Sequence, residues 1–282
     1  MFAPFSLNLR GRLLQLDRPA VMGILNITPD SFYTSSRAFD TDTVAQRVEK
    51  MIAEGVDIID VGACSTRPGA AEISSAEEMR RLESGLKILR KISSDIPVSV
   101  DTYRSEVARM AVENFGADII NDISGGEGDT EMFTTVADLH VPYILMHMRG
   151  NPATMSSMTE YDNVAAEVSA WLQRKVRELA LLGVSDVIVD PGIGFAKTVE
   201  QNYYLLNCIE IIAEITGRPV LIGLSRKSMI TRPFAINAED ALSPTTALNL
   251  YALQHGASLI RVHDVKEAVM AVKLNEMLNG IF

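Results

Sequence analysis

Short apolar runs and amphipathic helical stretches alternate eight times along this 282-residue chain, and this alternation restricts its fold more than any other feature. The candidate strands are residues 20–25, 57–61, 97–100, 119–121, 143–146, 187–189, 220–223 and 259–262. Helical patterns cover residues 43–54, 76–92, 106–115, 130–139, 163–182, 199–215, 238–255 and 265–278. Strands this short and apolar are typical of parallel strands buried on both faces. The sequence therefore predicts an α/β protein with a closed (βα)8 TIM barrel.

The chain shows no linker or low-complexity segment, so we expect residues 1–282 to form a single barrel domain, within the usual size of that fold. Residues 5–16 alternate around Arg10-Gly11-Arg12, which indicates an N-terminal β-hairpin across the bottom of the barrel. An open, doubly wound sheet is the alternative. Its dinucleotide-binding form lacks support, because no Gly-x-Gly-x-x-Gly follows the first strand.

Charge and composition exclude several classes of protein. A net charge of −10 disfavours binding to nucleic acid through phosphate contacts. The sequence contains no apolar run of about 18 residues, so we expect no membrane span. The first residues do not resemble a signal peptide. The two cysteines, Cys64 and Cys208, match no metal-ligand spacing, which is typical of free thiols in the cytoplasm.

Polar and ionisable residues gather where the predicted strands end, which is the face that carries function in this fold. They include Asn26, the run Ser65-Thr66-Arg67, Asp101, Asn121, Asp190, Lys227, Arg261 and His263. A single Asp or Asn after a strand is often only a helix cap, and Asp122 and Asp264 are expected to be caps of this kind. Caps alone do not explain two acids together with several basic residues.

This mixture predicts a site with two halves. The donors Thr66, Arg67, Arg261 and His263 suit a diphosphate, whose oxygens only accept hydrogen bonds. Asn26 offers an amide oxygen that could hold Mg²⁺, an ion usually shared with substrate phosphates.

The other half combines acids, an amide and a cation. Asp101, Asn121, Asp190 and Lys227 match the adjacent N–H donors and the carbonyl of an aminopyrimidinone ring. Met148 and Phe195 are the candidates for packing against the faces of that ring.

Five motifs in order resemble those of dihydropteroate synthases, and the resemblance extends from about Val21 to the C-terminus. They are Asn26-Ile27-Thr28-Pro29-Asp30-Ser31-Phe32, Ser65-Thr66-Arg67-Pro68-Gly69, Asp190-Pro191-Gly192-Ile193-Gly194-Phe195-Ala196-Lys197, Gly223-Leu224-Ser225-Arg226-Lys227-Ser228 and Arg261-Val262-His263-Asp264-Val265. The family joins 6-hydroxymethyl-7,8-dihydropterin diphosphate to 4-aminobenzoate and releases pyrophosphate in folate biosynthesis. The resemblance implies a Mg²⁺-dependent transferase of the same kind, which sulfonamides would target.

The resemblance also implies a role for each candidate residue. Pterin would be held by Asp101, Asn121, Met148, Asp190, Phe195 and Lys227. The diphosphate would be bound by Asn26, Thr66, Arg67, Arg261 and His263, with Mg²⁺ near Asn26. The 4-aminobenzoate site would be shaped by Phe32, Pro68, Lys227 and Ser228. Catalysis would depend on Asp101, Lys227, Arg261 and Asn26, and a homodimer through the last helices is expected.

Two departures from the family pattern keep alternatives open. The first motif continues as Tyr33-Thr34-Ser35-Ser36-Arg37, without the acid and the glycine pair that are usual there, and Cys64 stands where Glu is frequent. One alternative is a methyltetrahydrofolate-type barrel, which shares the Asp and Asn contacts to pterin but handles no diphosphate. The other is a catalytically silent pterin-binding protein, which the altered first loop would favour.

Overall fold

A computed structural model describes residues 2–27, 41–64 and 73–280. In that part of the chain eight parallel strands form one sheet, in the order β8-β7-β6-β5-β4-β3-β10-β9. Their bounds are β3 Ala20–Asn26, β4 Ile58–Gly62, β5 Val98–Asp101, β6 Ile119–Asp122, β7 Tyr143–Met146, β8 Val187–Asp190, β9 Leu221–Ile222 and β10 Leu259–Val262. A parallel bridge between Val189 and Val220 joins the two edges of the sheet, so the predicted barrel is confirmed.

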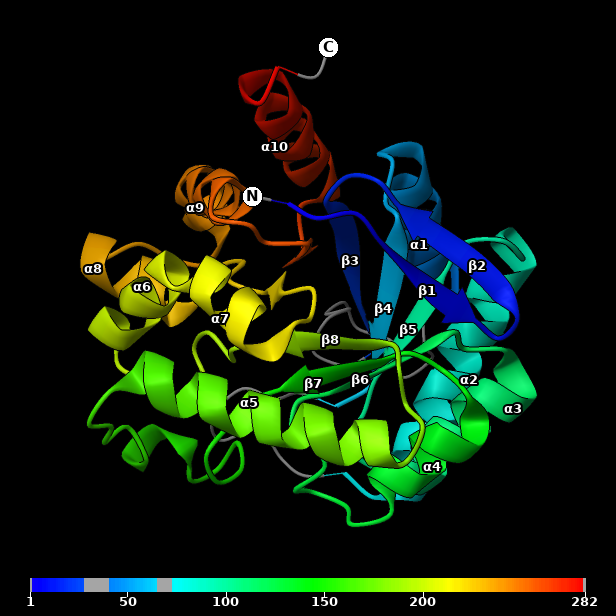
Figure 1. The fold of residues 1–282 in the computed structure, drawn as a ribbon. Helices are drawn as coiled ribbons and strands as arrows, with labels where there is room; N and C mark the ends of the chain where they lie inside the picture. The colour runs from blue at the N-terminus through cyan, green and yellow to red at the C-terminus, as the bar shows by residue number, and fades with distance from the viewer. Residues whose placement is uncertain (1, 28–40, 65–72, 281–282) are drawn as a thin grey trace.

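Helices surround the strands on the outside, as the ribbon in Figure 1 shows. They are α1 Thr41–Ala53, α2 Ser75–Ile92, α3 Ser105–Phe115, α4 Met132–Leu139, α5 Val164–Leu181, α6 Val199–Asn207, α7 Ile209–Thr216, α8 Ser228–Phe234, α9 Leu242–Gln254 and α10 Val265–Leu278, with short 3-10 turns at Met155–Ser157 and Glu239–Ala241. The large apolar core lies between the two layers, where outward residues such as Val61 and Val100 pack against helix residues such as Leu82 and Leu86.

Three helical segments differ from the prediction. The stretch expected over residues 199–215 divides into α6 and α7, because the backbone of Cys208 (φ −106°, ψ 9°) leaves the helical region. Helix α9 begins at Leu242 and not at residue 238, since Pro244 in its first turn has no N–H to continue a helix from further back. The short helix α8 was not predicted.

The N-terminal hairpin is confirmed and closes the bottom of the barrel. Strands β1 (Phe5–Leu9) and β2 (Arg12–Leu16) pair antiparallel. The hairpin leucines Leu7, Leu9 and Leu16 form one buried cluster with barrel residues that include Met22, Ile58, Ile119, Ile144, Ile188, Leu221 and Leu259. These barrel residues point inward, so apolar side chains fill the lower interior of the barrel.

The next inward layer is polar. Successive inward side chains on a strand lie two residues apart. Two residues beyond the apolar layer are Asp60 after Ile58, Asn121 after Ile119, Asp190 after Ile188 and Arg261 after Leu259. We call the upper end of the barrel, where these strands finish, the mouth. The change from apolar to polar within one step along each strand places the ionisable groups at the mouth.

Candidate active site

One guanidinium links three strands at the mouth. Arg261 on β10 donates from Nε to Oδ2 of Asp60 on β4 at 2.6 Å and from one terminal nitrogen to Oδ2 of Asp101 on β5 at 2.7 Å. Asn121 on β6 donates from Nδ2 to the same Asp60 oxygen at 3.1 Å. Two of the predicted site residues, Arg261 and Asn121, are therefore joined through the carboxylate of Asp60, which lies outside the five motifs quoted above, and Arg261 extends the network to Asp101.

Burial and charge shift the ionisation of these groups. Burial raises the pKa of Asp101 to about 7; Arg261 opposes the shift, and Asp60 adds to it. Burial lowers the pKa of Arg261, but the charges of Asp60 and Asp101 outweigh this effect, so its pKa lies above the usual value. The guanidinium stays charged, while Asp101 can exchange a proton near neutral pH.

The predicted pterin residues on β8 and in the following loop lie beside the cation from the loop after β9. Nζ of Lys227 donates to the carbonyl oxygen of Ile193 at 2.5 Å and lies 4.6 Å from the ring centre of Phe195. Oδ1 of Asp190 accepts from the backbone N–H of Gly192 at 2.7 Å. Burial lowers the pKa of Lys227 to about 8, against the opposing charge of Asp190. Burial also raises the pKa of Asp190, although Lys227 and this backbone N–H favour its charged form.

Met148 and Phe195, the two candidates for packing against a planar ring, belong to one small apolar cluster. The buried members are Ile123, Met146, Met148, Met155 and Ala196, with Tyr103 and Phe195 packed against them. Phe195 is also the ring that Lys227 approaches. The polar groups of the pterin half thus border an apolar surface, an arrangement that suits a flat heterocycle with hydrogen-bonding edges.

His263 and Ser228 occupy different environments. Nδ1 of His263 lies 3.0 Å from the hydroxyl of Ser225. Burial, together with the nearby charges of Arg261 and Arg226, lowers the pKa of His263 to about 4. His263 is therefore neutral at pH 7 and can offer a ring N–H but no charge. Ser228 is exposed at the start of α8.

The predicted caps have separate structural roles. The carboxylate of Asp122 accepts from the backbone N–H groups of Ser124 and Gly126, so it stabilises the turn after β6. Asp264 makes no side-chain cap to α10 and instead receives two hydrogen bonds from Arg226, at 3.0 and 2.6 Å. The cap expected of Asp264 is wrong, because Arg226 takes both carboxylate oxygens.

Asn26 ends β3 beside Asp101, with Gly62 between them. A side-chain carbon added at Gly62 would lie 3.6 Å from Oδ1 of Asn26 and 3.5 Å from Cβ of Asp101. The absence of a side chain at Gly62 therefore leaves space between an amide oxygen and a carboxylate. The other candidates, Phe32, Thr66, Arg67 and Pro68, and the altered loop at residues 33–37, lie outside the described residues.

Comparisons with known proteins agree with this geometry. Residues 22–263 match the model of a family described as pterin binding enzyme. The chain belongs to the pterin-binding enzyme family. It is 41% identical to a dihydropteroate synthase of Clostridium beijerinckii over 93% of this chain and 95% of that protein. It is 43% identical to a folate synthesis bifunctional protein of Arabidopsis thaliana over 90% of this chain, but it spans only 55% of that relative's length.

Solved structures of pterin-binding enzymes share the whole fold. A Xanthomonas albilineans dihydropteroate synthase with 4-aminobenzoic acid superposes with a TM-score of 0.91 at 36% identity, over 99% of this chain and 100% of that one. The same enzyme in complex with 7,8-dihydropteroate gives a TM-score of 0.87 at 34% identity, with the same coverage.

Lys197 is a further buried cation in this pterin-binding barrel to which the sequence analysis gave no role. Its Nζ donates to the carbonyl oxygens of Gly192 at 3.1 Å and Phe195 at 2.9 Å, and lies 3.1 Å from Nδ1 of His147. Burial lowers the pKa of Lys197 to about 7 and that of His147 to about 2, so His147 is neutral and its Nδ1 can accept. Lys197 therefore fastens the loop after β7 to the loop after β8.

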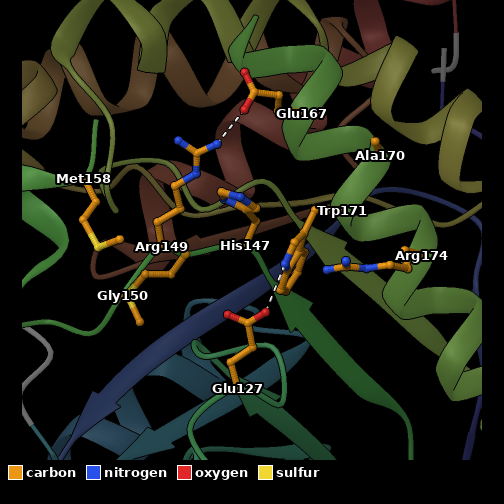
Figure 2. Close-up of a pocket in the computed structure, with 10 residues that line it drawn as sticks. Glu127, His147, Arg149, Gly150, Met158, Glu167, Ala170, Trp171 and Arg174 are labelled. Carbon is orange, nitrogen blue, oxygen red and sulfur yellow. Dashed lines mark hydrogen bonds and ion pairs between the residues drawn. The ribbon is translucent and has the colours of Figure 1, made fainter. Parts of the chain in front are cut away.

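A hollow of about 660 Å³ lies beside the mouth, between the loop after β7 and helix α5. In Figure 2 Arg149 faces Glu167, and Trp171 stands beside His147. Arg149 pairs with Glu167 at 2.5 Å, and the indole N–H of Trp171 donates to Glu127 at 3.2 Å. These polar groups already bind one another, so the hollow is a weaker candidate than the mouth.

No helix in the described part of the chain is long and apolar enough to cross a membrane.

Proposed function

We propose that this chain is a dihydropteroate synthase, which joins 6-hydroxymethyl-7,8-dihydropterin diphosphate to 4-aminobenzoate and releases pyrophosphate. The observation that carries the proposal is the set of polar side chains at the mouth, where Asp101 and Lys227 lie beside Asn121, Asp190 and Arg261 of the polar layer. The similarity to dihydropteroate synthases over nearly the whole chain supports it.

In the pterin half, the acceptors would recognise the ring edge. Asp190 and Asn121 offer oxygens to the N–H groups of the aminopyrimidinone, and Lys227 offers donors to its carbonyl and ring nitrogen. The apolar cluster of Met148 and Phe195 would pack against the face of the ring. These groups are buried, so a ligand lacking one N–H would leave an acceptor unpaired at a cost of about 1–3 kcal/mol.

The diphosphate half would stabilise the leaving group. The bond between the pterin methylene carbon and the diphosphate oxygen breaks, and its electron pair departs on pyrophosphate. Arg261 would place a permanent positive charge near the departing diphosphate oxygen, and neutral His263 would donate a ring N–H to the diphosphate. An ionised Asp101 would stabilise the cationic pterin-methyl group. The nitrogen of 4-aminobenzoate would then form the new bond to the methylene carbon and release one proton to solvent.

Mg²⁺ fits the donor chemistry at Asn26. Hard cations prefer oxygen ligands, and the amide oxygen of Asn26 lies at the mouth near Asp101, with space left by Gly62. Among the described residues no group of three or more His, Cys, Asp or Glu side chains could hold a metal by itself. Asn26 would therefore hold the ion together with diphosphate oxygens, and the ion would offset negative charge on the leaving group.

The second substrate, 4-aminobenzoate, would bind next to Lys227. We assign 4-aminobenzoate to the site shaped by Phe32, Pro68, Lys227 and Ser228, of which Ser228 is exposed at the start of α8. Sulfonamides would compete there, since a Yersinia pestis dihydropteroate synthase of 34% identity has been solved with a sulfonamide drug complex.

The assembly we propose is a homodimer in the cytoplasm. Helix α10 carries the exposed apolar residues Met270, Leu274 and Met277 at helical spacing, which suits contact with a second copy. Both cysteines are free, as expected in a reducing compartment. Sedimentation velocity tests the dimer: Leu274→Glu should give monomers, and an unchanged sedimentation coefficient would rule out this face.

The decisive assay measures pyrophosphate release from the pterin diphosphate with 4-aminobenzoate and Mg²⁺. We expect release that depends on both organic substrates and that Lys227→Ala nearly abolishes. Circular dichroism of this variant serves as the control for folding. Pterin binding without pyrophosphate release would instead identify a silent pterin-binding barrel.

A further inference from the structure

Asp60 is the one member of the polar layer to which the proposed reaction gives no role. It lies in the middle of β4, directed into the barrel, and its side chain is 0% exposed. A carboxylate at such depth is costly unless its oxygens are paired. Because no part of its side chain is exposed, its contacts with neighbouring side chains must explain why it is there.

Those contacts are made through a single oxygen. Oδ2 of Asp60 accepts from Nε of Arg261 at 2.6 Å and from Nδ2 of Asn121 at 3.1 Å, whereas Oδ1 is buried and accepts no hydrogen bond from the described residues. One carboxylate oxygen thus joins a residue assigned to the diphosphate half with a residue assigned to the pterin half.

The chemistry of the carboxylate fixes the orientation of the amide. An ionised carboxylate only accepts hydrogen bonds, so the NH₂ end of Asn121 must face Asp60, and its carbonyl end remains for a donor in the ligand. An apolar side chain at position 60 would accept no hydrogen bond and would leave the amide free to turn. Asp60 likewise holds Arg261 by Nε and leaves its terminal nitrogens for Asp101 and for an anion.

We propose that Asp60 is a positioning residue that sets the orientation of Asn121 for the pterin and of Arg261 for the diphosphate. The proposal rests on the proposed function for the identity of these ligands. Asp60 acts through its hydrogen bonds and touches neither substrate.

Two variants separate the hydrogen bonds from the charge. Asp60→Asn can place its carbonyl oxygen where Oδ2 lies and its NH₂ where Oδ1 lies, and no described donor is displaced there. Asp60→Leu has a similar shape and accepts nothing. The matched control is Ser99→Ala, because Ser99 is the register partner of Asp60 on β5, is buried, and has a hydroxyl without a partner among the described residues.

The test is calorimetry with 6-hydroxymethylpterin, which lacks the diphosphate, and separately with pyrophosphate. We expect Ser99→Ala and Asp60→Asn to bind both ligands within about threefold of the unmodified protein. Asp60→Leu should bind each at least about tenfold more weakly, since two buried donors lose their acceptor. Asp60→Leu binding like Ser99→Ala would overturn the proposal. If Asp60→Leu fails to fold, Asp60→Asn decides, and a tenfold loss in that variant would overturn it.

A double-mutant cycle shows whether Asp60 acts through Asn121. We expect Asn121→Ala to weaken pterin binding much less in the Asp60→Leu background than alone, because the amide there is already misoriented. Fully additive losses would overturn the proposal. Calorimetry measures binding and not turnover, so absent pyrophosphate release would refute the proposed function and leave this test unaffected.

Discussion

Replacing Lys197 by methionine should loosen the two loops that flank the pterin half. The ammonium has three donors, and three buried or partly buried acceptors receive them: the carbonyls of Gly192 and Phe195 and Nδ1 of His147. Each buried acceptor left unpaired costs about 1–3 kcal/mol, which gives about 3–9 kcal/mol in total. Methionine also avoids the cost of burying a charge, a cost reflected in the lowered pKa of Lys197. We therefore expect the free energy of unfolding to fall by about 3 kcal/mol, near the lower end of this range.

Thermal unfolding followed by circular dichroism measures this loss. A loss of about 3 kcal/mol corresponds to a fall in midpoint of about 6–12 °C for a chain of this size. The matched control is Lys87→Met, which removes an exposed pair with Glu83 and should cost less than about 1 kcal/mol. Pterin affinity should also fall in Lys197→Met, because the carbonyl of Phe195 loses its anchor. Equal midpoints for the two variants would refute the view that Lys197 fastens the loops.

Three further predictions concern the mouth. The pH profile of kcat/KM should be bell-shaped, because activity is gained as pH rises through about 7, where Asp101 ionises, and is lost above about 8, where Lys227 loses its proton. Asp101→Asn should flatten the acid limb of any residual activity. An acid limb that is unchanged in this variant would assign that limb to another group. Calorimetry with a pterin lacking the diphosphate should show that Asp190→Asn weakens binding by at least about fivefold while Arg261→Ala has a smaller effect, and equal losses would contradict the division into two halves. Chelation of Mg²⁺ should abolish pyrophosphate release, and excess Mg²⁺ should restore it. Asn26→Ala should raise the Mg²⁺ concentration needed for half-maximal pyrophosphate release. An unchanged Mg²⁺ dependence in this variant would exclude Asn26 as a ligand.

The fold could be read from the sequence because burial on both faces imposes one pattern on every strand. Each of the eight apolar runs became a strand within one or two residues of its predicted bounds. The errors occurred where local backbone chemistry overrides periodicity. The break at Cys208 interrupts a continuous apolar pattern, and the effect of Pro244 on the start of α9 depends on the missing N–H of one residue.

The candidate site was predictable to the extent that its residues follow strand ends. Asp101, Asn121, Asp190 and Arg261 were found for that reason. Asp60 was passed over because two residues of β4 follow it, although counting by two from Ile58 places it on the same inward face. Lys197 could not be found in this way, since its role depends on a turn that brings Nζ back to Gly192 and Phe195.

The hairpin at the bottom of the barrel has a consequence for the order of folding during synthesis. Its leucines bury themselves against Leu221 and Leu259, and β3 obtains its second neighbour only from β10. At about 5–20 residues per second, these partners leave the ribosome on the order of 10–50 seconds after the hairpin does. For that time the first apolar segment of the nascent chain lacks its final partners, which makes it a natural binding site for chaperones. Because contacts between the two ends complete the barrel, we expect refolding of the full chain to be slow and sensitive to protein concentration.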